Sequence, residues 1–306
     1  MHRIVIAHSL ASTIAERLAH IRPDLELRPM ALEDVTADDV AWAEAIVGFR
    51  RPAVGLGNAR WVHCIGAGVD GWLQGGWPEG LLLTRTTESF AAPIGEWVVA
   101  RLLYVSQNLR RLDQDQRDHT WDEFAPRMLS GTRAVVIGTG DVGQGIAERL
   151  SALGVHVTGC SRSGRQRNSF SVIKPISELP RLASGSDWLI VAAPLTPETR
   201  HMISRDLLQQ ARGAWLVNVA RGELVDENAM LDALNDGHLA GAALDVFSSE
   251  PLPADSPLWD LPNVIISPHI AGVTTVDGAV RGFLLALDAL ERGERPARVV
   301  DPDSGY

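Results

Sequence analysis

Short apolar runs alternate with amphipathic stretches along most of the chain, a pattern typical of parallel β-strands connected by helices. In the first third, residues 3–7 and 61–65 predict strands, residues 24–28 and 44–49 predict weaker ones, and residues 10–20 predict a helix. This alternation indicates a small parallel sheet.

A second and larger region repeats the alternation from about residue 131. Its expected strands cover 134–137, 155–160, 187–192, 214–219, 241–246 and 263–266, with helices near 204–211 and 226–236. Apolar runs separated by helices predict a doubly wound α/β domain. A last helical pattern occupies residues 275–292.

Between the two regions, an amphipathic pattern extends from Pro93 to about Arg117. Its apolar stripe consists of Ile94, Trp97, Val98, Leu102, Val105 and Leu109. The pattern predicts one long helix, because proline suits a first helical turn and the stripe keeps helical spacing. The stripe is larger than a helix that bridges two domains needs, and we therefore expect a homodimer.

Length, charge and cysteine content exclude several classes of protein. At 306 residues, the chain is long enough for two domains, each with its own core. A net charge of −10 argues against nucleic acid or an anionic membrane as the main partner. No apolar run approaches the ~20 residues of a membrane span, and the first run is too short for a signal peptide. Cys64 and Cys160 cannot form a disulfide framework, so we expect a cytoplasmic protein.

The strongest local signal is a glycine turn between a predicted strand and an amphipathic helix, Gly138-Thr139-Gly140-Asp141-Val142-Gly143. Gly138 allows the tight turn, Gly140 lets the backbone approach a pyrophosphate, and Gly143 lets the helix pack closely on the strand. The phosphates would lie over the helix N-terminus, where unpaired N–H groups favour an anion. The turn predicts dinucleotide binding, with a purely structural turn as the alternative.

Polar residues follow the last three predicted strands, namely Arg221, Glu250 and His269. Open parallel sheets bind ligands beyond the carboxyl ends of their strands. An arginine can clamp a carboxylate and polarise the adjacent carbonyl, a histidine can protonate the carbonyl oxygen, and a glutamate can stabilise the imidazolium. Together these residues predict a site for carbonyl reduction, although each one alone could be an ordinary loop residue.

These residues lie in motifs whose order and spacing resemble the D-2-hydroxyacid dehydrogenase family over essentially the whole chain. Besides the glycine turn, the motifs are Pro194-Leu195-Thr196-Pro197-Glu198-Thr199, Asn218-Val219-Ala220-Arg221-Gly222, Leu244-Asp245-Val246-Phe247 through Glu250-Pro251-Leu252, and Ser267-Pro268-His269-Ile270-Ala271. The resemblance implies two Rossmann-like doubly wound parallel-sheet domains, with the cofactor domain inserted into the substrate domain. We expect the substrate domain at 1–97 and 275–306 and the dinucleotide-binding domain at 98–274.

The resemblance also implies roles for individual residues. Arg221 would bind the substrate carboxylate and carbonyl, His269 would be the acid/base, and Glu250 would be its partner. Asp245 would hold the nicotinamide carboxamide. Further cofactor contacts would come from Gly138, Gly140, Asp141, Val142, Gly143, Pro194, Thr199 and Val219. Backbone N–H groups of Ala67, Gly68 and Val69 would bind the other side of the substrate carboxylate, a close approach that glycine permits. No metal is expected.

One departure from the family pattern concerns the cofactor. Many NAD-using members carry an acidic residue at the end of the second strand, where it binds the adenosine ribose. Here Cys160 takes that place, and Ser161, Arg162 and Arg165 follow it. Arginines and serines without a carboxylate suit a phosphate, so we expect NADP(H) to be preferred over NAD(H); the alternative is a solvated basic loop.

Within the family, the chain resembles the glyoxylate/hydroxypyruvate reductases that use NADPH. The resemblance implies an oxidoreductase that reduces small 2-oxo acids, such as glyoxylate or hydroxypyruvate, to D-2-hydroxy acids by hydride transfer. Relatives pair through the region of the 94–109 stripe, which agrees with the expected homodimer. A nicotinamide-sensing protein, like the corepressor relatives of the family, is the alternative.

Overall fold

The computed structural model describes residues 1–87 and 89–305, which divide into two compact units. Unit 1 comprises residues 1–90 and 274–306, and unit 2 comprises residues 91–273. The first boundary between the units follows Phe90, seven residues before the expected boundary at 97. The second boundary follows Val273, one residue before the expected boundary at 274. The reason for the first difference is that helix α4 packs on helix α6 from its very first residue.

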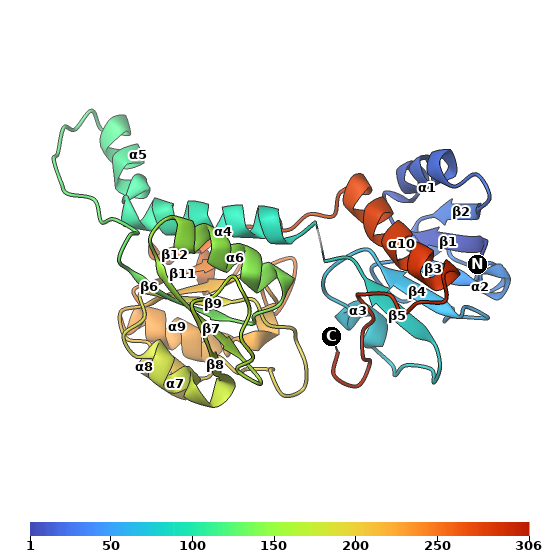
Figure 1. Cartoon of the computed structure of the whole chain (residues 1–306). Helices are drawn as coiled ribbons and strands as arrows, with labels where there is room; N and C mark the ends of the chain where they lie inside the picture. The colour runs from blue at the N-terminus through green and yellow to red at the C-terminus, as the bar shows by residue number, and fades with distance from the viewer. Residues whose placement is uncertain (88, 306) are drawn as a thin grey trace. The chain divides into compact units, whose positions relative to one another are not determined.

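Unit 1 is a five-stranded parallel sheet in the order β2-β1-β3-β4-β5 (Figure 1). The strands are β1 (Arg3–Ala7), β2 (Glu26–Met30), β3 (Ala45–Gly48), β4 (Trp61–Cys64) and β5 (Leu82–Arg85). The helices are α1 (Ala11–Ile21), η1 (Leu32–Asp34), α2 (Ala37–Trp42), α3 (Asp70–Leu73) and α10 (Val276–Glu291). Alternate residues of β1 enter separate cores on the two faces of the sheet: Ile4 and Ile6 pack with α1 and α10, and Val5 packs with α2 and α3.

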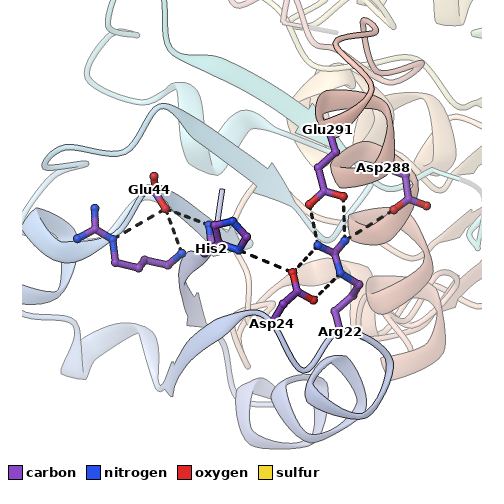
Figure 2. Close-up of polar contacts among 7 residues, drawn as sticks. His2, Arg22, Asp24, Glu44, Asp288 and Glu291 are labelled. Atoms are coloured by element: carbon purple, nitrogen blue, oxygen red, sulfur yellow. Dashed lines mark hydrogen bonds and ion pairs between the residues drawn. The ribbon is translucent and has the colours of Figure 1, made fainter.

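The C-terminal helix α10 completes unit 1 through both apolar and ionic contacts. Phe283 stacks on Trp61 of β4, with ring centroids 5.0 Å apart. At the surface, Arg22 lies between Asp24 and Glu291 and forms paired hydrogen bonds with both carboxylates, at 2.7–3.0 Å (Figure 2). The residue after α1 is therefore joined directly to the end of α10.

Unit 2 is a seven-stranded parallel sheet in the order β12-β11-β10-β9-β6-β7-β8. The strands are β6 (Arg133–Ile137), β7 (His156–Ser161), β8 (Val172–Pro175), β9 (Trp188–Val191), β10 (Trp215–Asn218), β11 (Gly241–Leu244) and β12 (Val264–Ile266). The helices are α4 (Ala91–Ser106), α5 (Leu109–Arg117), α6 (Asp141–Ala152), η2 (Ile176–Glu178), α7 (Leu179–Ala183), α8 (Arg205–Gln210), η3 (Gly222–Leu224), α9 (Glu227–Asn235) and η4 (Pro257–Trp259). Chain order reverses between β6 and β9, and this switch point is where doubly wound sheets bind their ligands. The predicted fold class is thus confirmed.

The prediction of one continuous helix over 93–117 is wrong. Helix α4 ends at Ser106, Asn108 adopts a left-handed conformation with φ 53°, and α5 begins at Leu109. Asparagine tolerates this conformation better than most residues, so a helix can end there. Helix α4 lies against α6, whereas α5 extends away from the sheet of unit 2 (Figure 1). Leu109, expected in the buried stripe, is consequently 37% exposed.

Candidate functional site

The glycine turn connects β6 to α6 at the switch point of unit 2. Gly138 has φ +100°, and a Cβ there would lie 2.4 Å from the Ala192 carbonyl oxygen. A Cβ on Gly143 would lie 2.0 Å from the Gly138 oxygen, whereas a Cβ on Gly140 would meet nothing within 4 Å. Gly140 is also the N-cap of α6 and supplies no side-chain cap. The turn is therefore closely packed against the protein at Gly138 and Gly143 and open at Gly140, as a pyrophosphate site requires.

The basic loop begins where β7 ends. Cys160 is fully buried, and burial raises the pKa of its thiol to about 12, so it places no negative charge there. The Ser161 hydroxyl accepts a hydrogen bond from the Gly164 N–H at 3.1 Å, which folds the loop back on itself. Arg162 and Arg165 are exposed. The strand end therefore offers hydroxyl and guanidinium groups at the surface in place of a carboxylate.

The loop after β9 carries Pro194 and Thr199. The Thr199 hydroxyl donates to the Pro194 carbonyl oxygen at 2.7 Å and accepts from the Thr196 N–H at 2.8 Å. Thr199 is thus used to hold this loop together. The pKa of Glu198 is lowered, first by its hydrogen bond with the Thr196 hydroxyl and also by the charge of Arg162. The charge of Arg162 therefore acts on the loop that follows β9.

Arg221 lies in a tight turn directly after β10. The Asn218 side chain accepts from the Ala220 N–H at 3.1 Å and donates to the Arg221 carbonyl oxygen at 2.8 Å, which fixes the turn. A Cβ on Gly222 would approach the Phe247 carbonyl carbon to 1.9 Å, so a larger residue cannot follow Arg221. Asn218 and Gly222, both in the quoted motif, therefore set the position of the arginine.

His269 and Glu250, which the resemblance implies as partners, lie in contact in the structure. His269 Nδ1 lies 2.8 Å from Glu250 Oε2, and Glu250 Oε1 accepts from the Phe247 N–H at 3.0 Å. This contact assigns the proton-bearing position to Nδ1 and leaves Nε2 for another partner. His269 has φ 54°, a left-handed conformation that costs a non-glycine residue about 1–3 kcal/mol and is often found at functional sites.

Asp245 holds the loop that carries this strained histidine. Its carboxylate is 1% exposed and accepts from Ser267 Oγ at 2.5 Å, the Ile270 N–H at 2.9 Å and the Ala271 N–H at 2.8 Å. The His269 N–H donates to the Asp245 carbonyl oxygen at 2.8 Å. The structure therefore places Asp245 as the anchor of the His269 loop.

Trp97 extends this network, although neither Trp97 nor Ser267 was expected in the site from the sequence. Its indole N–H donates to Ser267 Oγ at 3.1 Å, so α4 supports the same loop. The two residues are 170 positions apart, and no local pattern relates them. The only available signal was that Ser267 lies within the quoted 267–271 motif.

The loop 65–69 of unit 1 follows β4 and contains Ala67, Gly68 and Val69. A Cβ on Gly66 would lie 2.2 Å from the Phe49 ring, so this glycine lets the ring pack against the loop. Ala67 and Gly68 are partly exposed, and Val69 is buried.

Among residues 1–87 and 89–305, no cluster of three or more potential metal ligands occurs. Within the same residues, no helix combines the length and hydrophobicity of a membrane span.

Comparison with known proteins agrees with this geometry. The family model described as D-isomer specific 2-hydroxyacid dehydrogenase, NAD binding domain, matches residues 99–271. Glyoxylate/hydroxypyruvate reductase A of Serratia proteamaculans is 34% identical over 261 residues, which are 82% of each chain. A crystal structure of a D-isomer specific 2-hydroxyacid dehydrogenase from Xanthobacter autotrophicus Py2, in complex with NADPH and MES, aligns with a TM-score of 0.91 at 30% identity, over 100% of this chain and 99% of the other.

An NADPH-dependent glyoxylate/hydroxypyruvate reductase of Sinorhizobium meliloti, solved with NADP and sulfate, aligns with a TM-score of 0.89 at 26% identity over the whole of both chains. The matched family domain covers more than half of the chain, including the glycine turn, Arg221, Glu250 and His269. The resemblance seen in the sequence is confirmed. The chain belongs to the D-isomer specific 2-hydroxyacid dehydrogenase family and is an oxidoreductase with an NAD(P)-binding domain.

Proposed function

We propose that this enzyme uses NADP(H) to reduce small 2-oxo acids, with glyoxylate and hydroxypyruvate as the first candidates, to D-2-hydroxy acids. The observation that carries the proposal is the contact of 2.8 Å between His269 Nδ1 and Glu250 Oε2. Their strands, β11 and β12, are adjacent in the sheet, and β10, which leads to Arg221, is next to β11. The name of the Serratia proteamaculans relative supports the choice of substrates.

Each proposed residue has a distinct task in this reaction. Arg221 binds the substrate carboxylate through its planar guanidinium and polarises the neighbouring carbonyl. The reduced nicotinamide, when bound, supplies the hydride to the carbonyl carbon. His269 donates the Nε2 proton to the carbonyl oxygen, and Glu250 stabilises the ring through Nδ1. In the direction of oxidation, His269 accepts the proton of the hydroxyl group.

Three features support the preference for NADP(H). Cys160 places a neutral thiol where a ribose-binding carboxylate would repel a 2′-phosphate. Ser161, Arg162 and Arg165 follow it and can bind a phosphate through charge-assisted hydrogen bonds. The structures from Xanthobacter autotrophicus and Sinorhizobium meliloti contain NADPH and NADP, respectively.

We further propose that the protein is a homodimer formed through an arm, defined as α5 together with residues 118–128. The arm extends away from the sheet of unit 2 (Figure 1). Its exposed large apolar side chains include Leu112 (44%), Met128 (70%) and Trp121 (91%). Exposed apolar surface of this kind is typical of an interface between proteins, and a second copy of the chain would bury it.

The test is a panel of 2-oxo acids with NADPH and with NADH, which includes glyoxylate, hydroxypyruvate, pyruvate and aromatic acids. We expect turnover of the small acids, with a higher kcat/KM for NADPH than for NADH. The absence of turnover with every acid would refute the proposed reaction and would favour a cofactor-sensing protein. Equal or better use of NADH would refute the cofactor preference alone.

The acid/base role is tested with His269→Ala and a matched control, His201→Ala. His201 is also exposed and also has φ 54°. We expect turnover to fall by roughly 10²–10⁴-fold in His269→Ala, with unchanged NADPH affinity, and to stay close to wild type in His201→Ala. Near-normal turnover of His269→Ala would remove this residue from the mechanism.

A further inference from the structure

The loop 65–69 of unit 1 is held through its carbonyl oxygens. The Ile65 oxygen accepts from Thr274 Oγ1 at 3.3 Å, and the Gly68 oxygen accepts from Cys64 Sγ at 3.2 Å. Between them, the Ala67 oxygen accepts from Arg85 Nη1 at 2.9 Å. Strands β4 and β5 and the segment just before α10 thus all contribute to one short loop.

Because the peptide unit is planar, these contacts of the carbonyl oxygens also determine the directions in which the Gly68 and Val69 N–H groups point. In a trans peptide unit, the carbonyl of one residue and the N–H of the next point to opposite sides. The contact with Arg85 therefore turns the Gly68 N–H away from Arg85, and the contact with Cys64 turns the Val69 N–H away from Cys64. Within the described part of the chain, neither N–H makes a hydrogen bond.

Arg85 is well placed to hold the loop, because its own backbone is fixed. Its N–H donates to the Arg298 carbonyl oxygen at 3.1 Å, and Thr84 forms an antiparallel bridge with Val299. The side chain is half-buried, and its guanidinium is charged at any working pH. A cation bound to the Ala67 oxygen also polarises the peptide unit, which makes the Gly68 N–H a stronger donor to an anion.

We propose that Arg85 is a positioning residue for substrate binding, which acts through the Ala67–Gly68 peptide unit rather than by touching the substrate. It fixes the Gly68 and Val69 N–H groups as a pair of donors for the carboxylate of a 2-oxo acid. The inference rests on the proposed function, because it takes this carboxylate as the ligand. The proposal assigns part of the affinity for the acid to a residue outside the site motifs.

The experiment measures steady-state kinetics for Arg85→Met with the best 2-oxo acid of the panel. We expect KM for the acid to rise about 10- to 100-fold, the loss typical of one charged hydrogen bond, with kcat within a few fold of wild type. NADPH affinity should not change, because the glycine turn lies in unit 2. Arg85→Lys, which keeps a charged donor, should recover part of the loss.

Two controls separate positioning from a general effect on folding. Arg28→Met removes another partly exposed arginine of unit 1, which pairs with Asp39 at 2.9 Å, and should leave KM unchanged. If Arg85→Met does not fold, Arg85→Gln serves in its place, because glutamine is neutral and shorter but keeps a donor. An unchanged KM in a folded variant, or a fall in kcat at constant KM, overturns the proposal.

A binding measurement distinguishes this proposal from the proposed function. Oxalate has two carboxylates and no ketone to reduce, so its affinity for the NADPH-loaded protein can be measured by calorimetry without turnover. Loss of oxalate binding in Arg85→Met supports the positioning role even if no acid of the panel is reduced. Normal oxalate binding in Arg85→Met overturns it, whether or not the wild type is active. A wild type that binds no oxalate overturns it as well.

Discussion

His63, on β4 of unit 1, predicts a loss of stability in mild acid. Its side chain is fully buried, with Nδ1 2.8 Å from Thr84 Oγ1 and Nε2 3.0 Å from Thr86 Oγ1. The Trp61 and Phe283 rings contact it edge-on, with centroids 5.8 Å away in both cases. None of these four partners carries a negative charge that could stabilise an imidazolium. Burial accordingly lowers the pKa of His63 from 6.5 to about 3.

The sign and size of the effect follow from this shift. Below about pH 6.5 the unfolded chain binds a proton at His63, whereas the folded protein does not bind it until about pH 3. The stabilisation is therefore fully present above pH 6.5 and is lost as the pH falls toward 3. For one such group, the free energy of unfolding decreases by about 2 kcal/mol between pH 7 and pH 5, and by about 3 kcal/mol by pH 4.

Hydrogen exchange of the β4 amides is a suitable assay, because it reports on unit 1 separately from unit 2. After correction for intrinsic rates, their protection factors should fall about 30-fold from pH 7 to pH 5. His63→Gln keeps a polar side chain but cannot titrate, so its protection should start lower and change less. His20→Gln, on the exposed surface of α1, should lose protection as the wild type does. If His63→Gln loses as much protection as the wild type, His63 is not the source of the pH dependence.

Three further predictions concern cofactor choice, assembly and surface ion pairs. Arg162→Ala should lower NADPH affinity tenfold or more and leave NADH use nearly unchanged, and adding Cys160→Asp should reverse the preference; kcat/KM for each cofactor checks both. Trp121→Asp should yield monomers in light scattering at micromolar concentration, and an unchanged mass would show that the arm does not form the interface. Hydrogen bonding to Arg22 lowers the pKa of Asp24 from 3.8 to about 2, so this contribution to stability is present above about pH 4 and is lost as the pH falls toward 2. Arg22→Gln should therefore flatten the acid unfolding profile of unit 1 in this range.

The central strands and the strand-end residues were predictable because each leaves a local signal. Buried strands of a parallel sheet are apolar on both faces, so β6 and β9 appear in the sequence as short continuous apolar runs. The edge strands β5 and β8 were missed. The burial of both is incomplete, and β8 contains Lys174 and Pro175, which weaken the apolar signal. Proline is tolerated there because one side of an edge strand needs no partner.

Contacts between distant residues could be predicted from the sequence only where both residues follow neighbouring strands. The pairing of His269 with Glu250 followed from their positions after neighbouring strands, since parallel strands end at the same edge. The bonds of the Asp245 carboxylate to three donors depend on the path of the loop after β12, which no periodicity describes. The expectation for Asp245, which came from the family resemblance, was accordingly a contact with the cofactor alone.

The anchoring of two loops by buried or half-buried charged groups has a consequence for how substitutions act in this enzyme. Asp245 binds backbone and hydroxyl donors around His269, and Arg85 binds a backbone carbonyl beside the Gly68 N–H. In each case, the charged group binds other atoms of the loop and does not occupy the atom that is proposed to bind the ligand, which is His269 Nε2 in one loop and the Gly68 N–H in the other. Replacing the anchor removes no proposed contact with the reacting atoms, yet it releases the conformation on which the contact depends. A substitution that raises KM alone therefore indicates that the replaced residue anchors the substrate-binding loop. A substitution that lowers kcat indicates that the replaced residue anchors the His269 loop, because the strained backbone of His269 must be held in place during proton transfer.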